Sequence, residues 1–176
     1  MKGNARDVAP FLELAEGFDV AVDGSLSARY DGTRGSLEDR LAVEEMEALY
    51  RGPLRGMIVE NAAEPDDDAF KCNCARGNAA VASNGDVYPC IAAPLVAGNV
   101  RERTFGEIWR ESPVFRRIRG LRISDFKTCA PCDLKRWCRR SAGNAYLATG
   151  EYTGADPWTC AEAEALRRVM TDSPQR

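Results

Sequence analysis

The chain has 176 residues, 44% of them hydrophobic and 29% charged, a composition typical of a globular protein and unlike that of disordered or collagen-like chains. Its formal net charge of -3 gives no general electrostatic reason to bind nucleic acid. The sequence contains no histidine, which excludes imidazole bases, Ser-His and Cys-His nucleophile pairs and every metal site that uses histidine. We therefore expect a globular protein that has no nucleic-acid partner and whose chemistry does not depend on histidine.

The cellular compartment follows from the N-terminal segment and the cysteines. The first 17 residues mix charged with apolar residues and lack the apolar run of a secretory signal, and no window of the sequence is long and apolar enough to span a membrane. We therefore expect a cytoplasmic protein without a membrane partner. In a reducing cytosol, clustered cysteines are more often metal ligands than disulfides, and the odd count of seven points the same way.

The N-terminal residues predict a helix followed by a strand. Residues 7–17 carry apolar residues at helical spacing, and Gly17 supplies a stop signal. Residues 18–23, FDVAVD, have the pattern of a short strand. This alternation of helix and strand predicts an α/β element.

A loop and a second helix complete the first part of the chain. Residues 24–36 are rich in Gly and Ser, and residues 36–52 predict a helix that is capped by Ser36. The acidic stretch EPDDDAF then separates this part from the cysteines. We place a domain boundary there, near residue 65.

The first cysteines surround a predicted β-hairpin. Asn84 and Gly85 lie between two short β-prone runs, which is a strong local signal for a tight turn. Such a hairpin would bring Cys90 back towards Cys72 and Cys74.

Two helical regions follow the hairpin. Residues 104–121 carry a helical apolar pattern that is broken at Pro113, and we expect their aromatic side chains to pack in the core. A closing helix is predicted over residues 160–172, and it begins at Cys160.

The thiols fall into two groups from different parts of the chain. A C-x2-C pair lets one turn direct two thiolates at the same ion or cluster, and here a third cysteine follows after five residues while a distant one is available. Sulfur ligands without histidine favour zinc or an iron-sulfur cluster over copper, nickel or magnesium. The first group comprises Cys72, Cys74 and Cys90, and the second comprises Cys129, Cys132, Cys138 and Cys160.

The order of the cysteines is more specific than any single pair. Cys74, Gly85 and Cys90 fit C-x10-G-x4-C, and C-x2-C-x5-C and a late cysteine in ADPWTC follow. This order resembles the SPASM domain, the C-terminal auxiliary-cluster module of radical SAM enzymes that mature peptides and proteins. The resemblance implies an α+β fold. Residues 1–65 look like the last helix-strand units of a partial TIM-type barrel, and residues 66–176 look like a SPASM domain with a β-hairpin and short helices.

The resemblance also implies ligand sets for two 4Fe-4S clusters. The second group of cysteines is a complete set for the second auxiliary cluster. For the first cluster, Cys74 and Cys90 match the family, Cys72 is an extra thiol close by, and the remaining cysteine position of the family is Ala142 here. A related variant of the motif has its cysteine one residue earlier, at Ser141. The first site can therefore use Cys72 and leave one iron open, accept the oxygen of Ser141, or be lost.

A basic stretch lies within the second ligand loop. Lys135, Arg136, Arg139 and Arg140 are donors and cations that would compensate the negative charge of a buried cluster with thiolate ligands. A solvated helix face is an equally open interpretation of these residues. Gly143, which follows, would allow a close backbone approach or serve as a simple turn residue.

The function implied by the resemblance is that of the iron-sulfur cluster-binding part of a radical SAM/SPASM enzyme that modifies a peptide or protein. Its clusters would transfer an electron or anchor the substrate, and no side chain would act as an acid or base. The implied partners are a ribosomally made peptide or protein and a separate radical SAM half. The C-x3-C-x2-C of the SAM-binding cluster does not occur in these 176 residues, so we expect no SAM binding or cleavage by this chain alone.

Two other classes of function fit the same thiols. Four thiolates can hold one zinc ion in a structural scaffold or partner-binding module without a catalytic role, and the spacing alone does not exclude it. A residual domain in which the thiols are partly vestigial is the third alternative, and Ala142 favours it for the first site only.

Overall fold

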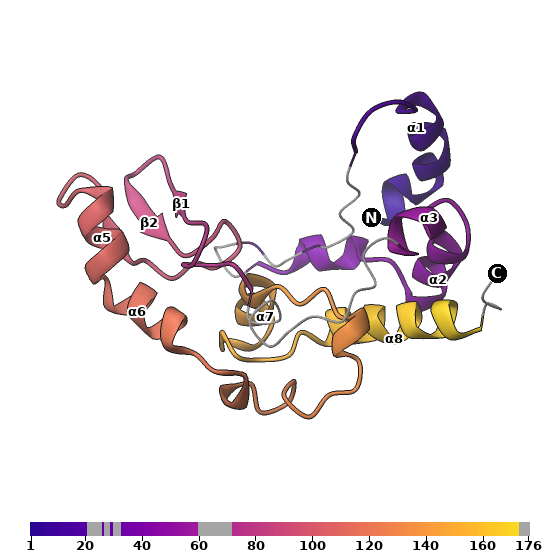
Figure 1. Ribbon diagram of the computed structural model, residues 1–176. Helices are drawn as coiled ribbons and strands as arrows, with labels where there is room; N and C mark the ends of the chain where they lie inside the picture. Colours follow the sequence, from indigo (N-terminus) through magenta and orange to yellow (C-terminus); the bar gives the residue numbers. More distant parts are fainter. Residues whose placement is uncertain (21–25, 27–28, 30–32, 60–71, 173–176) are drawn as a thin grey trace. The chain divides into compact units, whose positions relative to one another are not determined.

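The computed structural model describes residues 1–20, 26, 29, 33–59 and 72–172. Its helices are η1 (Lys2–Asp7), α1 (Val8–Leu14), η2 (Gly35–Asp39), α2 (Val43–Arg51), α3 (Arg55–Val59), α5 (Phe105–Glu111), α6 (Pro113–Gly120), η3 (Ile123–Asp125), η4 (Lys135–Trp137), α7 (Ala142–Thr149) and α8 (Pro157–Thr171) (Figure 1). Its strands are β1 (Ala80–Val81), β2 (Asp86–Tyr88) and β3 (Gly98–Asn99). In this part of the chain, no helix is long and apolar enough to cross a membrane.

The chain divides into two compact units, each described on its own. The first unit comprises Met1–Glu64, Asp133–Arg139 and Pro157–Arg176, and the second comprises Pro65–Cys132 and Arg140–Asp156. The combination of helices with a small antiparallel sheet confirms the predicted α+β class.

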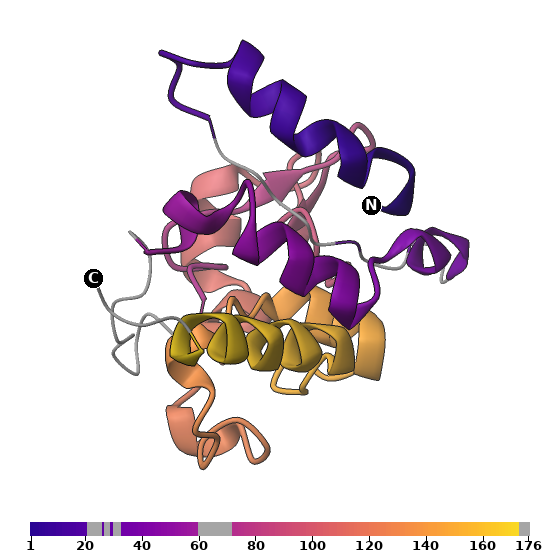
Figure 2. The same cartoon turned by 90° about the vertical axis from the view of Figure 1, so that its right-hand side faces the viewer.

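The first unit is built around helices α2 and α8, which lie side by side (Figure 2). Apolar residues one turn apart on each helix face the shared core, which consists of Leu41, Met46, Tyr50, Leu54, Leu166 and Val169. The hydroxyl of Tyr50 donates a hydrogen bond of 2.5 Å to Glu162, so a buried carboxylate on α8 has a partner on α2. This polar contact fixes the register of the two helices within an apolar interface.

The helix predicted over residues 36–52 is interrupted, and Ser36 does not cap it. Its first residues form the short helix η2, Arg40 is extended, and α2 begins only at Val43. The carboxylate of Glu45 accepts a hydrogen bond of 2.7 Å from the N–H of Ala42, which caps α2 from within its own first turn. The guanidinium of Arg40 lies 5.1 Å from the ring centroid of Trp158 on α8. These contacts stabilise the interruption, and local helix signals do not reveal them.

The N-terminal helix is confirmed, whereas the strand after it is not. The predicted helix over residues 7–17 is seen as α1, which ends at Leu14, with the short helix η1 before it. Residues 18–20 of the predicted strand are irregular, and residues 21–23 lie outside the described residues. Among the described residues of 1–59 there are helices and no strand, so barrel units in this region stay a prediction.

The second unit contains an antiparallel sheet in the order β1-β2-β3. Strand β1 pairs with β2 through Ala80 opposite Tyr88, and β2 pairs with β3 through Val87 opposite Gly98. Gly85 in the β1-β2 turn has a φ of +93°, a conformation that favours glycine, and Val87 is fully buried. The hairpin predicted from Asn84-Gly85 is therefore confirmed.

Helices α5 and α6 follow the sheet, with the break at Pro113 that the sequence predicts. Thr104 and Glu107 form a reciprocal capping box at the start of α5, and Pro113 is the first residue of α6. Phe115 is fully buried and packs in one core with Val87 of β2. The closing helix α8 is also confirmed, although it begins at Pro157 and places Cys160 in its first turn.

Candidate metal centre

The three thiols of the first group come together in the second unit. The sulfurs of Cys72 and Cys74 are 3.3 Å apart, and Cys74 and Cys90 belong to one buried core against which Cys72 packs. The N–H of Ala75 donates to the carbonyl of Pro89 at 3.1 Å, which ties the loop of Cys74 to the strand end that carries Cys90. The hairpin therefore brings Cys90 back to the other two thiols, as the sequence predicts.

The loop that carries Cys72 and Cys74 has an unusual backbone. Cys72 has a φ of 72° and Ala75 a φ of 58°, both in the left-handed region that residues with a side chain seldom occupy. On the other side of the site, the N–H of Ala92 donates to the sulfur of Cys90 at 3.4 Å. Backbone conformation on one side and backbone donors on the other thus arrange the three sulfurs.

The three thiols ionise unequally. A hydrogen bond from Cys74 and, against the effect of burial, one from the Ala92 N–H lower the pKa of Cys90 to about 7. The pKa of Cys72 is raised, first by its hydrogen bond with Cys74 and then by burial. Two opposing effects act on the pKa of Cys74. The hydrogen bond with Cys72 lowers it, but the hydrogen bond with Cys90 and burial outweigh that effect, so the pKa of Cys74 is raised. Cys90 is therefore the thiol that loses its proton first.

Helix α7 brings the remaining ligand position of the family to the same place. Ala142 is fully buried in the core that contains Cys74 and Cys90, and its N–H hydrogen bonds to Cys72. The hydroxyl of Ser141 accepts a hydrogen bond of 3.3 Å from the N–H of Asn144 and so caps α7. The position of Ala142 lies against the thiols but carries no ligand atom, and the hydroxyl of Ser141 has a structural role.

Several donors in the second unit are buried without an acceptor. Among the described residues, no partner is found for the hydroxyl of Tyr152, for Nε and Nη1 of Arg140, or for Nη2 of Arg119. Arg119 also donates from Nε to the carbonyl of Ala75 at 2.7 Å, next to Cys74. Buried donors of this kind, three of them on the two guanidinium groups, are costly unless an anionic acceptor is present. A metal cluster with thiolate ligands is such an acceptor, so the donor set fits the implied cluster.

Tyr152 is the polar side chain most closely linked to the thiols. It is 8% exposed and packs in the core of Cys74, Cys90 and Ala142. Burial and then the neighbouring thiol of Cys74 raise the pKa of its phenol, which stays protonated. Its hydroxyl lies beside that thiol, but the two neutral groups do not complete a hydrogen bond of normal geometry.

The thiols are not arranged as a finished site for one ion. In the described ranges, no group of three His, Cys, Asp or Glu side chains is set to hold a metal ion. Tetrahedral zinc with Zn–S bonds of about 2.3 Å holds two ligand sulfurs about 3.8 Å apart. The sulfurs of Cys72 and Cys74 are closer, at 3.3 Å, because the neutral thiols hydrogen bond to each other. Metal binding must therefore remove protons and separate these two sulfurs.

The second group of cysteines is divided between the two units. Cys129 and Cys132 belong to the second unit, where the N–H of Cys132 bonds to the carbonyl of Cys129 at 3.1 Å in a tight turn. Cys138 and Cys160 belong to the first unit. There η4, directly before Cys138, packs on α8, which carries Cys160. Each pair is thus held by local structure, and their joint ligation of one cluster stays a prediction.

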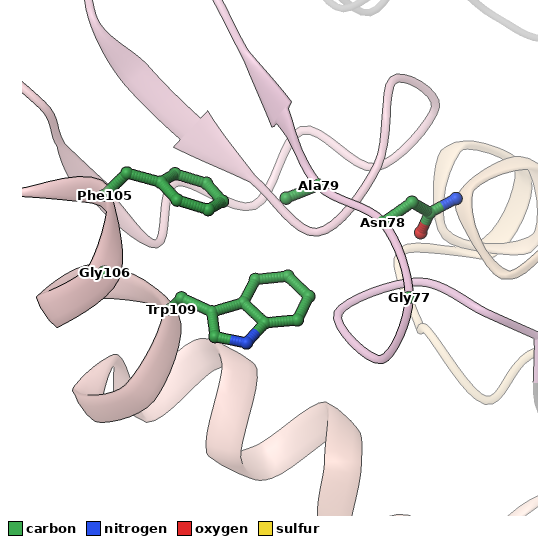
Figure 3. Close-up of a pocket in the computed structure, with 6 residues that line it drawn as sticks. All are labelled: Gly77, Asn78, Ala79, Phe105, Gly106 and Trp109. Carbon is green, nitrogen blue, oxygen red and sulfur yellow. The ribbon is translucent and has the colours of Figure 1, made fainter.

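A shallow hollow of about 290 Å³ lies in the second unit beside the loop of Cys74 (Figure 3). Gly77, Asn78 and Ala79 line one side, and Gly106 of α5 with the rings of Phe105 and Trp109 lines the other. The two rings are stacked with centroids 5.9 Å apart. The sequence places Trp109 in the core, and it packs there, but it also forms part of this surface.

Sequence reasoning found the thiols but not all of their surroundings. Arg140 is one of four basic residues with two open interpretations, and its partly buried guanidinium, which contacts the carbonyl of Tyr152 and the ring of Phe126, does not fit a solvated helix face. Arg119 and Tyr152 were missed. Arg119 lies in an ordinary helical pattern and carries no local signal, whereas Tyr152 follows Gly150, whose φ of 78° ends α7 and turns the chain back.

Comparisons with known proteins bear on this geometry. Residues 72–133 match the family model of SPASM, described as an iron-sulfur cluster-binding domain. The AdoMet-dependent heme synthase of Methanosarcina barkeri is 39% identical over 87 residues, which are 49% of this chain and 25% of that protein. The PqqA peptide cyclase of Methylorubrum extorquens strain PA1 is 30% identical over 177 aligned residues, 89% of this chain and 45% of that protein.

The PqqA peptide cyclase of Methylocella silvestris is 33% identical over 129 residues, 66% of this chain and 33% of that protein. The chain thus spans between a quarter and just under half of these relatives. No solved structure matches it significantly. The first group of thiols and the C-x2-C pair of Cys129 and Cys132 all lie within the matched residues. The resemblance is therefore confirmed, and residues 72–133 belong to the SPASM family of iron-sulfur cluster-binding domains.

Proposed function

We propose that this chain is the iron-sulfur cluster-binding part of a radical SAM/SPASM enzyme that modifies a peptide or protein. One observation carries the proposal. Three thiols are gathered in a segment that matches the SPASM family, and buried donors in the same unit lack acceptors. Neutral thiols leave these donors unsatisfied, whereas thiolates on a cluster accept from them.

The residues of the first site have separate roles. Cys72, Cys74 and Cys90 bind three irons of a 4Fe-4S cluster. Ala142 has no ligand atom, so the fourth iron, on the side of the cluster that faces Ala142, has no protein sulfur as ligand. When bound, a 4Fe-4S cluster supplies one-electron transfer and, at an iron without a protein ligand, a position for a substrate atom. The guanidinium groups of Arg119 and Arg140 offset the negative charge of the thiolates, and no side chain acts as an acid or base.

The second site is proposed to be complete. Cys129, Cys132, Cys138 and Cys160 supply four thiolates to a second 4Fe-4S cluster. With all of its irons ligated by protein, this site serves electron transfer and not substrate binding.

The substrate class follows from the relatives and is part of the proposal. Two of the relatives are named as cyclases of the PqqA peptide. We assign to this chain a ribosomally made peptide or protein as substrate, and a radical SAM half as the partner that generates the radical. Reduced thiols suit a cytoplasmic location.

Anaerobic purification of the 176-residue chain tests the proposal. We expect brown protein with absorption near ~400 nm and about four irons and four sulfides for each complete cluster. Cys90→Ala should remove the first cluster and Cys132→Ala the second, as judged by iron content and by EPR of the reduced protein. Colourless protein with about one zinc ion per chain would instead establish the structural zinc module.

A second measurement tests the absence of radical generation. The chain has no C-x3-C-x2-C, so it should produce no 5'-deoxyadenosine from SAM under reducing conditions. Detection of that product with the pure 176-residue chain would contradict the assignment of radical generation to a partner.

A further inference from the structure

Tyr152 combines burial with an unsatisfied hydroxyl at the first thiol site. The side chain is 8% exposed, and no hydrogen-bond partner for its hydroxyl is found in the described part of the chain. It packs in the same core as Cys74, Cys90 and Ala142. A buried hydroxyl is normally hydrogen bonded, so an orphaned one requires an explanation.

The position of Tyr152 is fixed by contacts of its own loop. Arg140 donates from Nη2 to the carbonyl of Tyr152 at 2.5 Å and to that of Gly154 at 3.0 Å. The guanidinium carbon of Arg140 lies 4.6 Å from the ring centroid of Phe126, which is fully buried. Arg140 thus holds the backbone at Tyr152, while the tyrosine side chain is enclosed by the buried core that contains Cys74 and Cys90.

The neighbours of the hydroxyl explain what it lacks. A phenol is a donor at neutral pH, and a neutral thiol is a weak acceptor. A thiolate is a strong acceptor, and hydrogen bonds to ionised partners are shorter and about twice as strong. The hydroxyl is therefore placed for a state of the site in which the sulfur beside it carries a negative charge.

From this geometry we infer that Tyr152 is a positioning residue of the first cluster site, whose O–H donates to the sulfur of Cys74 when that sulfur ligates iron. The inference rests on the proposed function. A donor at a ligand sulfur stabilises the reduced cluster, which is the more negative state, and so raises the reduction potential. Tyr152 thus tunes the readiness of the first cluster to accept one electron.

The test compares Tyr152→Phe with wild type in the anaerobically reconstituted 176-residue chain. The first cluster is identified as the EPR signal that Cys90→Ala removes, and its reduction potential is measured by titration with dithionite. We expect Tyr152→Phe to keep its iron and to shift this potential to a more negative value. Tyr146→Phe is the matched control, because Tyr146 is a partly buried tyrosine that packs against the same core.

A readout on the iron-free protein separates donation to the cluster from a general structural role. Without a cluster, Tyr152→Phe removes a hydroxyl that has no acceptor, so its melting temperature should equal or exceed that of wild type. With the cluster loaded, wild type should melt at a higher temperature than Tyr152→Phe. A merely structural tyrosine would give the same order in both states.

The outcomes separate the inference from the proposed function. Absence of iron from the first site of the wild type would refute both. Iron in wild type and in Tyr152→Phe with equal potentials would refute the inference alone. Loss of one iron from Tyr152→Phe would show that the phenol oxygen is a ligand and not a donor, which also overturns it.

Discussion

Gly143→Ala tests whether α7 must press against the loop of Cys90. Gly143 is buried in α7, and a methyl group added to it would lie 2.5 Å from the carbonyl carbon of Ala92 and 2.6 Å from its Cβ and oxygen. Ordinary contacts of this kind are 3.4–4 Å long. The loop that follows Cys90 would therefore have to move by about 1 Å, against close packing.

The magnitude follows from two opposing effects. Overpacking of a close-packed core costs about 1–3 kcal/mol, whereas replacing glycine by alanine within a helix gains about 1 kcal/mol. The atoms in the way belong mainly to the backbone of Ala92, so no side-chain rotation relieves the clash. Because the clash falls on backbone, we expect the upper part of that cost, about 2–3 kcal/mol, and hence a net loss of about 1–2 kcal/mol. Such a loss lowers the melting temperature of a chain of this size by about 2–8 °C.

Gly120→Ala is the matched control for that variant. Gly120 is the last residue of α6, and no described residue comes within 4 Å of a methyl group added there. Its melting temperature should stay the same or rise, because alanine restricts the unfolded chain. Melting of iron-free protein followed by circular dichroism, with iron content after reconstitution, measures both variants. If Gly143→Ala melts at or above wild type and binds the same iron, the close approach of α7 to the loop of Cys90 is wrong.

Three further substitutions address the ligands. Ser141→Ala removes the cap of α7 and should cost about 1 kcal/mol in unfolding experiments; loss of iron as well would show that its oxygen is a ligand. Cys132→Ala should lower both iron content and melting temperature, because metal binding contributes directly to the folding of cysteine-rich modules, and unchanged values would refute a structural second site. Ala142→Cys restores the family's sulfur beside Cys72, so the first cluster should resist a chelator for longer than in wild type, and an unchanged rate of iron loss would place residue 142 outside the site.

The elements that the sequence predicts correctly are those with local causes. The turn at Asn84-Gly85 needs a residue that tolerates positive φ, and Pro113 cannot continue the helix before it, so each signal acts within a few residues. The break before α2 is different. Arg40 packs on Trp158, and the indole N–H of Trp158 donates to the carbonyl of Leu41 at 3.3 Å. A partner more than 110 residues away overrides the local helix signal.

The features of the site also differ in whether their causes are local in the sequence. Cysteine spacing is a property of the sequence, so the sequence alone identifies the thiols and their resemblance to the SPASM domain. The contact of Ala142 with the thiols, the cap formed by Ser141 and the donors Arg119 and Tyr152 all depend on packing between distant segments. No periodicity or spacing encodes such contacts, and a tyrosine next to a glycine-rich turn resembles many surface tyrosines.

Without metal, the second unit buries positive guanidinium groups but keeps the thiols of Cys72 and Cys74 neutral, so the positive charge has no negative partner in these two thiols. Without metal, Arg119 and Arg140 bury guanidinium nitrogens that have no acceptor among the described residues, while the pKa values of Cys72 and Cys74 are raised, so these two thiols stay neutral. The unpaired guanidinium nitrogens are unfavourable, whereas a buried neutral thiol behaves as a small apolar group and costs little. Iron binding requires deprotonated sulfur, and under the proposed function the resulting thiolates supply the negative charge that these guanidinium groups lack. The excess of buried donors therefore suits the proposed anionic cluster better than a structure in which the thiols stay neutral.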